Sequence, residues 1–224
     1  MTRKLALLAA VSAVALLGVP LGAQATQITL LGSTSGSFTF TGNGTTVSVS
    51  TTGVSGPAVF QPTGFPTENG TYTLGALNAT TGVNVAGQYA FPAGTTESFN
   101  YTGADNDMLS GTLLLSSVQD ATSTPKFNAV LNNVVSSGDP LFTGSFPTGQ
   151  NGLRVDFTTT SLFIDGTTTT QTLDQLVANK QTAAVGVSSG EVVPGPIVGA
   201  GLPGLVAACG GLLALARRRR KQTA

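Results

Sequence analysis

The chain has 224 residues, and its ten acidic and ten basic residues give a formal net charge of zero. All ten carboxylates lie between Glu68 and Glu191, where only three cations oppose them, so residues 26–193 carry a net charge of −7. A domain with so few cations cannot neutralise the negative charge of phosphate groups, which argues against nucleic-acid binding. The only cysteine, Cys209, excludes an intrachain disulfide, and the absence of histidine removes the usual base of a nucleophilic triad.

The first 25 residues have the three parts of a secretory signal peptide. A basic start at Arg3 and Lys4 precedes a mostly apolar stretch over Leu5–Gly22, and Ala23 and Ala25 are the small residues that a signal peptidase recognises. We therefore predict cleavage after Ala25 and export of the residues that follow. The alternative is an uncleaved anchor, because eighteen mostly apolar residues approach the length that spans a membrane.

Residues 26–190 are predicted to form an exported all-β domain. Ser37–Thr41 and Thr46–Ser50 alternate apolar and hydroxyl side chains, and Gly42-Asn43-Gly44 between them predicts a hairpin turn. Both phenylalanines of the first run are expected on one face, as in a half-buried antiparallel strand. Further strands are expected at Thr26–Leu31, Thr71–Leu74, Ser98–Thr102, Gly111–Ser117 and Phe127–Val134.

A second hairpin and one helix are predicted near the end of this domain. Leu153–Phe157 alternates like a strand, Asp165-Gly166 supplies a turn, and the threonine-rich residues 167–172 are expected to form the return strand. Thr172–Asn179 predicts a short helix with its three large apolar residues on one face. Many short strands separated by turns indicate an antiparallel β-sandwich or jelly roll, flanked by an N-terminal signal helix and a C-terminal transmembrane helix.

One loop of the domain has residues suited to a metal ion. Gly103-Ala104-Asp105-Asn106-Asp107 places two carboxylates and an amide within three positions, and such oxygen atoms are ligands for calcium. We predict weak calcium binding at Asp105 and Asp107, with no other cofactor. The spacing is not that of an EF-hand, and the alternative is an Asx-rich turn between two strands.

Residues 191–224 have the composition of a membrane-associated tail. Val193, Pro194, Gly195 and Pro196 precede an uncharged stretch over residues 197–216, which is long enough to cross a membrane. A basic cluster follows directly and marks the cytoplasmic side, which places the domain outside: Arg217, Arg218, Arg219, Arg220 and Lys221. The alternative is an ordinary single-pass anchor.

The order of these segments resembles the PEP-CTERM sorting signals that exosortases recognise in Gram-negative bacteria. The match is to a variant with Val-Pro-Gly-Pro-Ile followed by Gly-Ala-Gly-Leu-Pro-Gly-Leu, here Val193–Ile197 and Gly199–Leu205, and covers about thirty of 224 residues. Gly195 stands where the family usually has glutamate, which leaves the processing enzyme and the cleavage point open. The resemblance implies a protein held transiently in the inner membrane and then delivered to the cell surface or the extracellular space.

The resemblance also implies partners but no molecular activity. The partners are a signal peptidase, an exosortase-like processing enzyme, the membrane before processing, and extracellular polysaccharide. The favoured function is a non-enzymatic surface or matrix protein. The alternatives are a calcium- or carbohydrate-binding module in the exopolysaccharide matrix and a secreted hydrolase that uses two carboxylates. No motif marks catalytic residues, and a chain with three tyrosines and no tryptophan offers few aromatic platforms for sugars.

Overall fold

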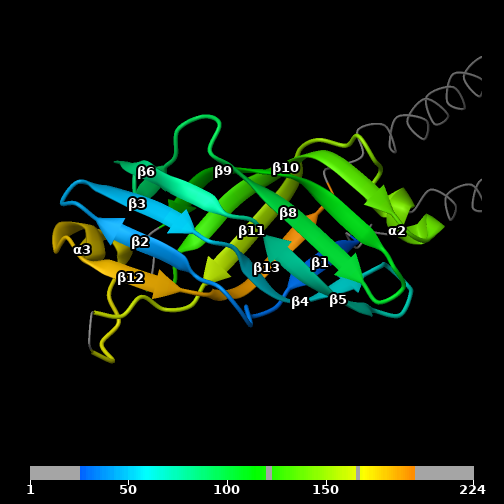
Figure 1. Ribbon diagram of the computed structural model, residues 1–224, viewed down its shortest axis with the longest axis horizontal. Helices are drawn as coiled ribbons and strands as arrows, with labels where there is room; N and C mark the ends of the chain where they lie inside the picture. The colour runs from blue at the N-terminus through cyan, green and yellow to red at the C-terminus, as the bar shows by residue number, and fades with distance from the viewer. Residues whose placement is uncertain (1–25, 120–122, 165–166, 195–224) are drawn as a thin grey trace, which may run out of the picture. The chain divides into compact units, whose positions relative to one another are not determined.

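The computed structural model describes residues 26–119, 123–164 and 167–194, which form mainly antiparallel β-strands (Figure 1). The predicted signal peptide and the predicted span over residues 197–216 lie outside these described residues. Within them, no helix has the length and apolar character needed to cross a membrane. The strands are β1 (Gln27–Leu30), β2 (Phe38–Gly42), β3 (Thr46–Thr51), β4 (Val54–Gln61), β5 (Glu68–Leu74), β6 (Leu77–Val85), β7 (Gln88–Ala90), β8 (Thr96–Gly103), β9 (Met108–Gln119), β10 (Lys126–Ser137), β11 (Leu153–Thr159), β12 (Thr182–Val185) and β13 (Val187–Val193), and the helices are α2 (Pro140–Ser145) and α3 (Leu173–Ala178).

Eight of the described strands close into a ring, so the sheet forms a barrel in the order β10-β11-β13-β1-β4-β5-β8-β9. The ring closes because β9 pairs with β8 on one side and with β10 on the other. The prediction of an all-β antiparallel domain is confirmed. The predicted sandwich of two sheets is not what forms, since the strands belong to one hydrogen-bonded sheet that curves onto itself. Register shifts between β9 and β10 at Asn128/Ala129 and Asn132/Val135 are bulges, which bend and twist a strand pair.

A second part of the sheet branches from β9. Beyond its pairing with β8, β9 pairs with β7, and β6, β3, β2 and β12 follow in order. The hairpin of β2 and β3 is confirmed, with Phe38 opposite Thr51 and Gly42 opposite Val47. Asn43 holds its turn, because its Oδ1 accepts hydrogen bonds from the backbone N–H groups of Thr45 and Thr46.

The second predicted hairpin forms only in part. β11 is present, but the return strand is reduced to one bridge between Phe163 and Thr170, and the turn at residues 165–166 lies outside the described residues. Thr172 is instead the N-cap of α3. Its hydroxyl accepts a hydrogen bond from the N–H of Gln175, and the Gln175 side chain accepts one from the N–H of Thr172. The predicted helix is confirmed, and its apolar face is buried: Leu173, Leu176 and Val177.

Two groups of aromatic side chains fill the core. Phe127 lies 5.0 Å from Phe38 and 4.7 Å from Phe157 between ring centroids, which joins the branch of the sheet to the ring. The helix α2 lies at the other end of the strands (Figure 1). Its residue Phe142 packs against the ring, with 5.0 Å between its centroid and that of Phe60. Burial of each phenylalanine contributes about 1.5–3 kcal/mol. The packing of Phe142 therefore fixes α2 against the strands that it covers.

Candidate functional site

Three carboxylates meet beside α2, and we call Glu68, Asp107 and Asp139 the acidic cluster. One oxygen from each lies within 4.8 Å of the others. Glu68 is the first residue of β5, Asp107 immediately precedes β9, and Asp139 is the N-cap of α2. The fold brings them together through neighbouring strands. β5 pairs with β8, and a short turn connects β8 to β9. On its other side β9 pairs with β10, and α2 follows β10 in the chain.

Local hydrogen bonds hold two of these carboxylates in place. The Asp139 side chain accepts from the N–H of Phe142 at 2.8 Å, with Pro140 at the first helical position. The N–H of Asp139 in turn donates to Oδ1 of Asp107 at 2.8 Å. Gly138 permits this approach, because it has a φ of +130° and a Cβ there would lie 1.8 Å from Oδ1 of Asp107.

The acidic cluster is buried on one side and short of hydrogen-bond donors. Asp107 has no exposed surface, and within the described part of the chain neither its Oδ2 nor Oε2 of Glu68 has a hydrogen-bond partner. Burial, followed by the nearby charge of Asp107, raises the pKa of Glu68. The hydroxyl of Tyr101 is also buried without a partner, and burial, aided by the charges of Glu68 and Asp107, raises its pKa to about 12. The cluster thus gathers negative charge and free oxygen atoms in one place.

The structure places one of the two predicted calcium ligands in this cluster. Asp105 is exposed in the turn between β8 and β9, and its charge makes the smallest of the contributions that raise the pKa of Glu68. The turn is closed by the N–H of Gly103, which donates to the carbonyl of Asp107 at 2.7 Å, and Asn106 adopts a φ of 65°. The alternative of an Asx-rich turn therefore also describes this segment.

The other two cluster residues are absent from the sequence-based prediction. Asp139 was detectable as a helix start, since an aspartate directly before a proline is a common N-cap signal. Glu68 has no comparable signal, because its proximity to Asp107 depends on the pairing of β5 with β8.

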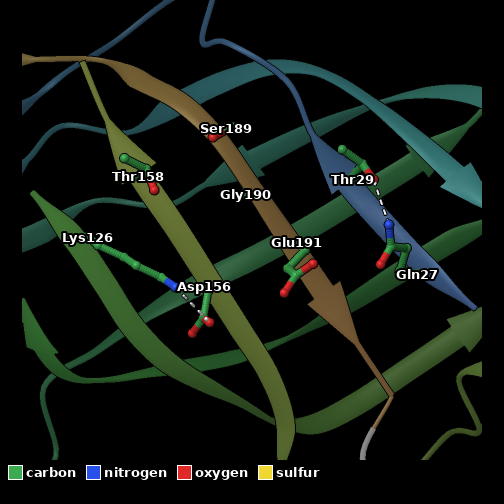
Figure 2. A pocket seen from close by; sticks show the side chains of 8 residues that line it. All are labelled: Gln27, Thr29, Lys126, Asp156, Thr158, Ser189, Gly190 and Glu191. Carbon is green, nitrogen blue, oxygen red and sulfur yellow. Dashed lines mark hydrogen bonds and ion pairs between the residues drawn. The ribbon is translucent and has the colours of Figure 1, made fainter. Parts of the chain in front are cut away.

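A second candidate lies on the outer face of the ring, and we call it the polar depression (Figure 2). It is open, with a volume of about 250 Å³, and is lined by Gln27, Thr29, Lys126, Asp156, Thr158, Ser189, Gly190 and Glu191. Lys126 points toward Asp156, with Nζ 3.5 Å from Oδ2, and Glu191 lies between Asp156 and Gln27 (Figure 2). Arg154 also pairs with Asp156, and this hydrogen bond and charge raise the pKa of Arg154. The depression offers hydroxyl, amide and charged groups to a polar ligand.

The tyrosines do not take part in an exposed ligand-binding surface. Tyr72, Tyr89 and Tyr101 are at most 2% exposed, so none presents its ring face to a sugar. Two phenylalanines are exposed instead, Phe65 at 60% and Phe163 at 47%. Neither lines the polar depression.

Most of the predicted sorting residues lie outside the described residues. Val193 is the last residue of β13 and lies opposite Arg154 of β11, so the boundary drawn after residue 190 falls within this strand. Pro194 follows the strand. The other residues of the two predicted processing signals are not described: Ala23, Ala25, Gly195, Pro196, Arg217, Arg218, Arg219, Arg220 and Lys221.

Comparison of the chain with protein-family models, with curated proteins and with solved structures gives no match. The function must therefore be argued from the residues and their geometry.

Proposed function

We propose that the chain is an exported, non-enzymatic protein of the cell surface or extracellular matrix, sorted through its PEP-CTERM-like tail. The observation that supports this most directly is that the contacts within the chain group Ala25–Gly195 into one compact unit. Its described strands begin at Gln27, shortly after the expected cleavage site, and end at Val193, just before the Pro-Gly-Pro of the sorting motif. Loss of both end segments would leave this unit with all its described strands and its aromatic core.

The first and last strands of the unit suggest where processing occurs. β1 begins two residues after Ala25 and pairs with β13, with Ile28 opposite Val192. β13 also pairs with β11, so it lies inside the ring rather than at an edge. Cleavage within β13 would leave buried backbone groups of β1 and β11 without partners. We therefore expect cleavage on the carboxyl side of Val193.

A carbohydrate-binding role in the exopolysaccharide matrix is the second candidate, and the polar depression supports it. Its hydroxyl, amide and carboxylate groups are suited to hydrogen bonding with sugar hydroxyls. The hydrolase ranks last, because no motif marks catalytic residues and one carboxylate of the acidic cluster, Asp107, has no exposed surface for a glycan to reach.

Intact-mass measurement of the extracellular protein from the native cell tests the proposal. We expect an N-terminus at Thr26, a C-terminus at or just beyond Pro194, and loss of residues 217–221. Replacement of all five cations of the basic cluster by glutamine is expected to abolish this processing, because the tail loses its cytoplasmic retention signal. The matched control replaces Lys126 and Lys180 by glutamine and is expected to leave processing unchanged.

Extracellular material that still carries Arg217–Lys221 would contradict the sorting proposal. An unprocessed protein confined to the cytoplasm would contradict export itself.

A further inference from the structure

We propose that the acidic cluster is a calcium site, and that the bound ion joins β5, the start of β9 and α2. This inference goes beyond export and sorting and does not depend on them. It also differs from the pair Asp105 and Asp107 indicated by the sequence, since two of its three carboxylates come from elsewhere in the chain.

The spacing of the oxygen atoms suits one shared ion. Calcium binds oxygen at about 2.3–2.6 Å, so two oxygens on the same ion are separated by at most about 5 Å. The oxygens of Glu68, Asp107 and Asp139 all lie within 4.8 Å of one another. Glu68 and Asp139 are only partly buried, which leaves room on the solvent side for the waters that complete a coordination shell of six to eight oxygens.

Buried oxygens without partners are the second observation. Asp107 is fully buried and Tyr101 is 1% exposed; among residues 26–119, 123–164 and 167–194, neither Oδ2 of Asp107 nor the Tyr101 hydroxyl has a hydrogen-bond partner. A Cβ at Gly103 would lie 3.1 Å from the Tyr101 hydroxyl and 3.2 Å from Cβ of Asp107, so this hydroxyl and the Asp107 side chain flank the same point of the backbone. A buried acceptor without a partner destabilises the fold, and a bound cation removes that cost.

The donor set favours calcium over other metals. All three side chains offer carboxylate oxygen, whereas zinc sites in proteins usually include histidine or cysteine. Magnesium demands near-ideal octahedral geometry and retains its water, which suits a partly buried, irregular set of carboxylates less well. The remaining competitor is a proton shared between Glu68 and Asp107, which agrees with the raised pKa of Glu68.

The consequence of binding is mechanical. Asp139 caps α2, and the α2 residue Phe142 stacks on Tyr101 with 5.7 Å between ring centroids. An ion held by Asp139, Glu68 and Asp107 therefore ties α2 to the strands it covers. A site with three carboxylates and one side open to solvent is expected to bind calcium as weakly as extracellular calcium modules do, with a Kd of about 10⁻⁴–10⁻³ M.

The experiment is calorimetric titration of the chelator-treated full-length protein with calcium chloride at pH 7.5, followed by thermal unfolding at 10 mM calcium. We expect one site in this affinity range and a rise in Tm of about 2–8 °C. Magnesium chloride at the same concentrations is expected to bind at least tenfold more weakly. Equal binding of magnesium would overturn the assignment to calcium.

Three variants locate the site. Asp107→Asn and Glu68→Gln are expected to weaken binding at least tenfold, and Glu68→Gln remains informative if the buried Asp107 variant does not fold. Asp105→Asn is the matched control, since Asp105 is exposed and lies outside the cluster; its Kd is expected within twofold of the wild-type value. An Asp105→Asn variant as weak as Glu68→Gln would overturn the cluster as the site.

A shared proton gives a different result. In that case calcium produces no heat and no change in Tm, and Tm falls as the pH rises through the raised pKa of Glu68. That outcome would overturn the calcium site and leave the export proposal untouched.

Discussion

Carboxylates on the outer face of the ring and carboxylates turned toward its interior have opposite surroundings. On the outer face, Asp156 has two cations beside it, Lys126 and Arg154. In the interior, Glu97 is 4% exposed, and neither of its carboxyl oxygens has a hydrogen-bond partner among the described residues. The same holds for one oxygen of Asp107. Asp156 and Glu97 both lie on strands, whose side chains alternate between the two faces of the sheet. The face on which a carboxylate falls, rather than its residue type, decides whether it is neutralised by a neighbour.

The largest expected effect comes from Glu97. Burial raises the pKa of Glu97 from 4.5 to about 8. Between these values the folded protein keeps a proton that the unfolded chain has released, so the free energy of unfolding falls as the pH rises. The slope is about 1.4 kcal/mol per pH unit, and the total reaches up to about 5 kcal/mol. Glu97→Gln is expected to abolish this dependence and to be more stable than the wild type at pH 8.

Chemical denaturation at pH 4.5, 6 and 8 measures this effect. The matched control is Glu191→Gln on the outer face, which is expected to keep the wild-type pH dependence. If the free energy of unfolding changes with pH in the same way for the wild type and for Glu97→Gln, Glu97 is not a protonated interior group. The proposed difference between the two faces would then not hold for Glu97.

The next effect concerns the approach of Asp139 to Asp107. Gly138→Ala is expected to destabilise the protein by about 2–4 kcal/mol, because the added Cβ meets Oδ1 of Asp107 and the backbone has a φ of +130°. Gly144→Ala within α2 is the control: nothing lies within 4 Å of its Cβ, and alanine in a helix is expected to stabilise by about 0.5–1 kcal/mol. Denaturant unfolding compares the two. Equal stability of both variants would show that the acidic cluster tolerates a wider spacing.

The sequence predicts the parts of this fold that depend on neighbouring residues. The β2–β3 hairpin follows from alternation and from Asn43 in its turn, and α3 follows from the Thr172 cap and one apolar face. Closure of the ring does not follow, because it depends on β9 pairing with both β8 and β10 and on bulges whose positions no local pattern marks. β4 is also difficult to predict, since Pro57 lies within it and proline is uncommon in paired strands.

The same limit applies to the candidate site. Asp107 is predictable from a loop rich in aspartate and asparagine. Its neighbours Glu68 and Asp139 become cluster residues through strand pairing and the placement of α2, which single-sequence patterns do not contain. Burial also separates the two predicted ligands: Asp105 and Asp107 have similar sequence surroundings, but Asp105 is exposed and Asp107 is fully buried.

The smallest expected effect comes from the outer face. Lys126→Met removes one of the two cations beside Asp156, and the cost is expected to be about 0.2–1 kcal/mol, because the lysine side chain is 42% exposed and Arg154 still pairs with the carboxylate. The cost should fall in 1 M sodium chloride, since salt screens exposed charges.

Adding Arg154→Met leaves Asp156, whose side chain is 8% exposed, without a cation. The double variant should therefore lose more stability than the sum of the losses of the two single variants. A double-mutant cycle by denaturant unfolding measures this coupling. Strict additivity would mean that Asp156, like Glu97, needs no cation beside it, and neutralisation by a neighbour would then no longer distinguish the two faces.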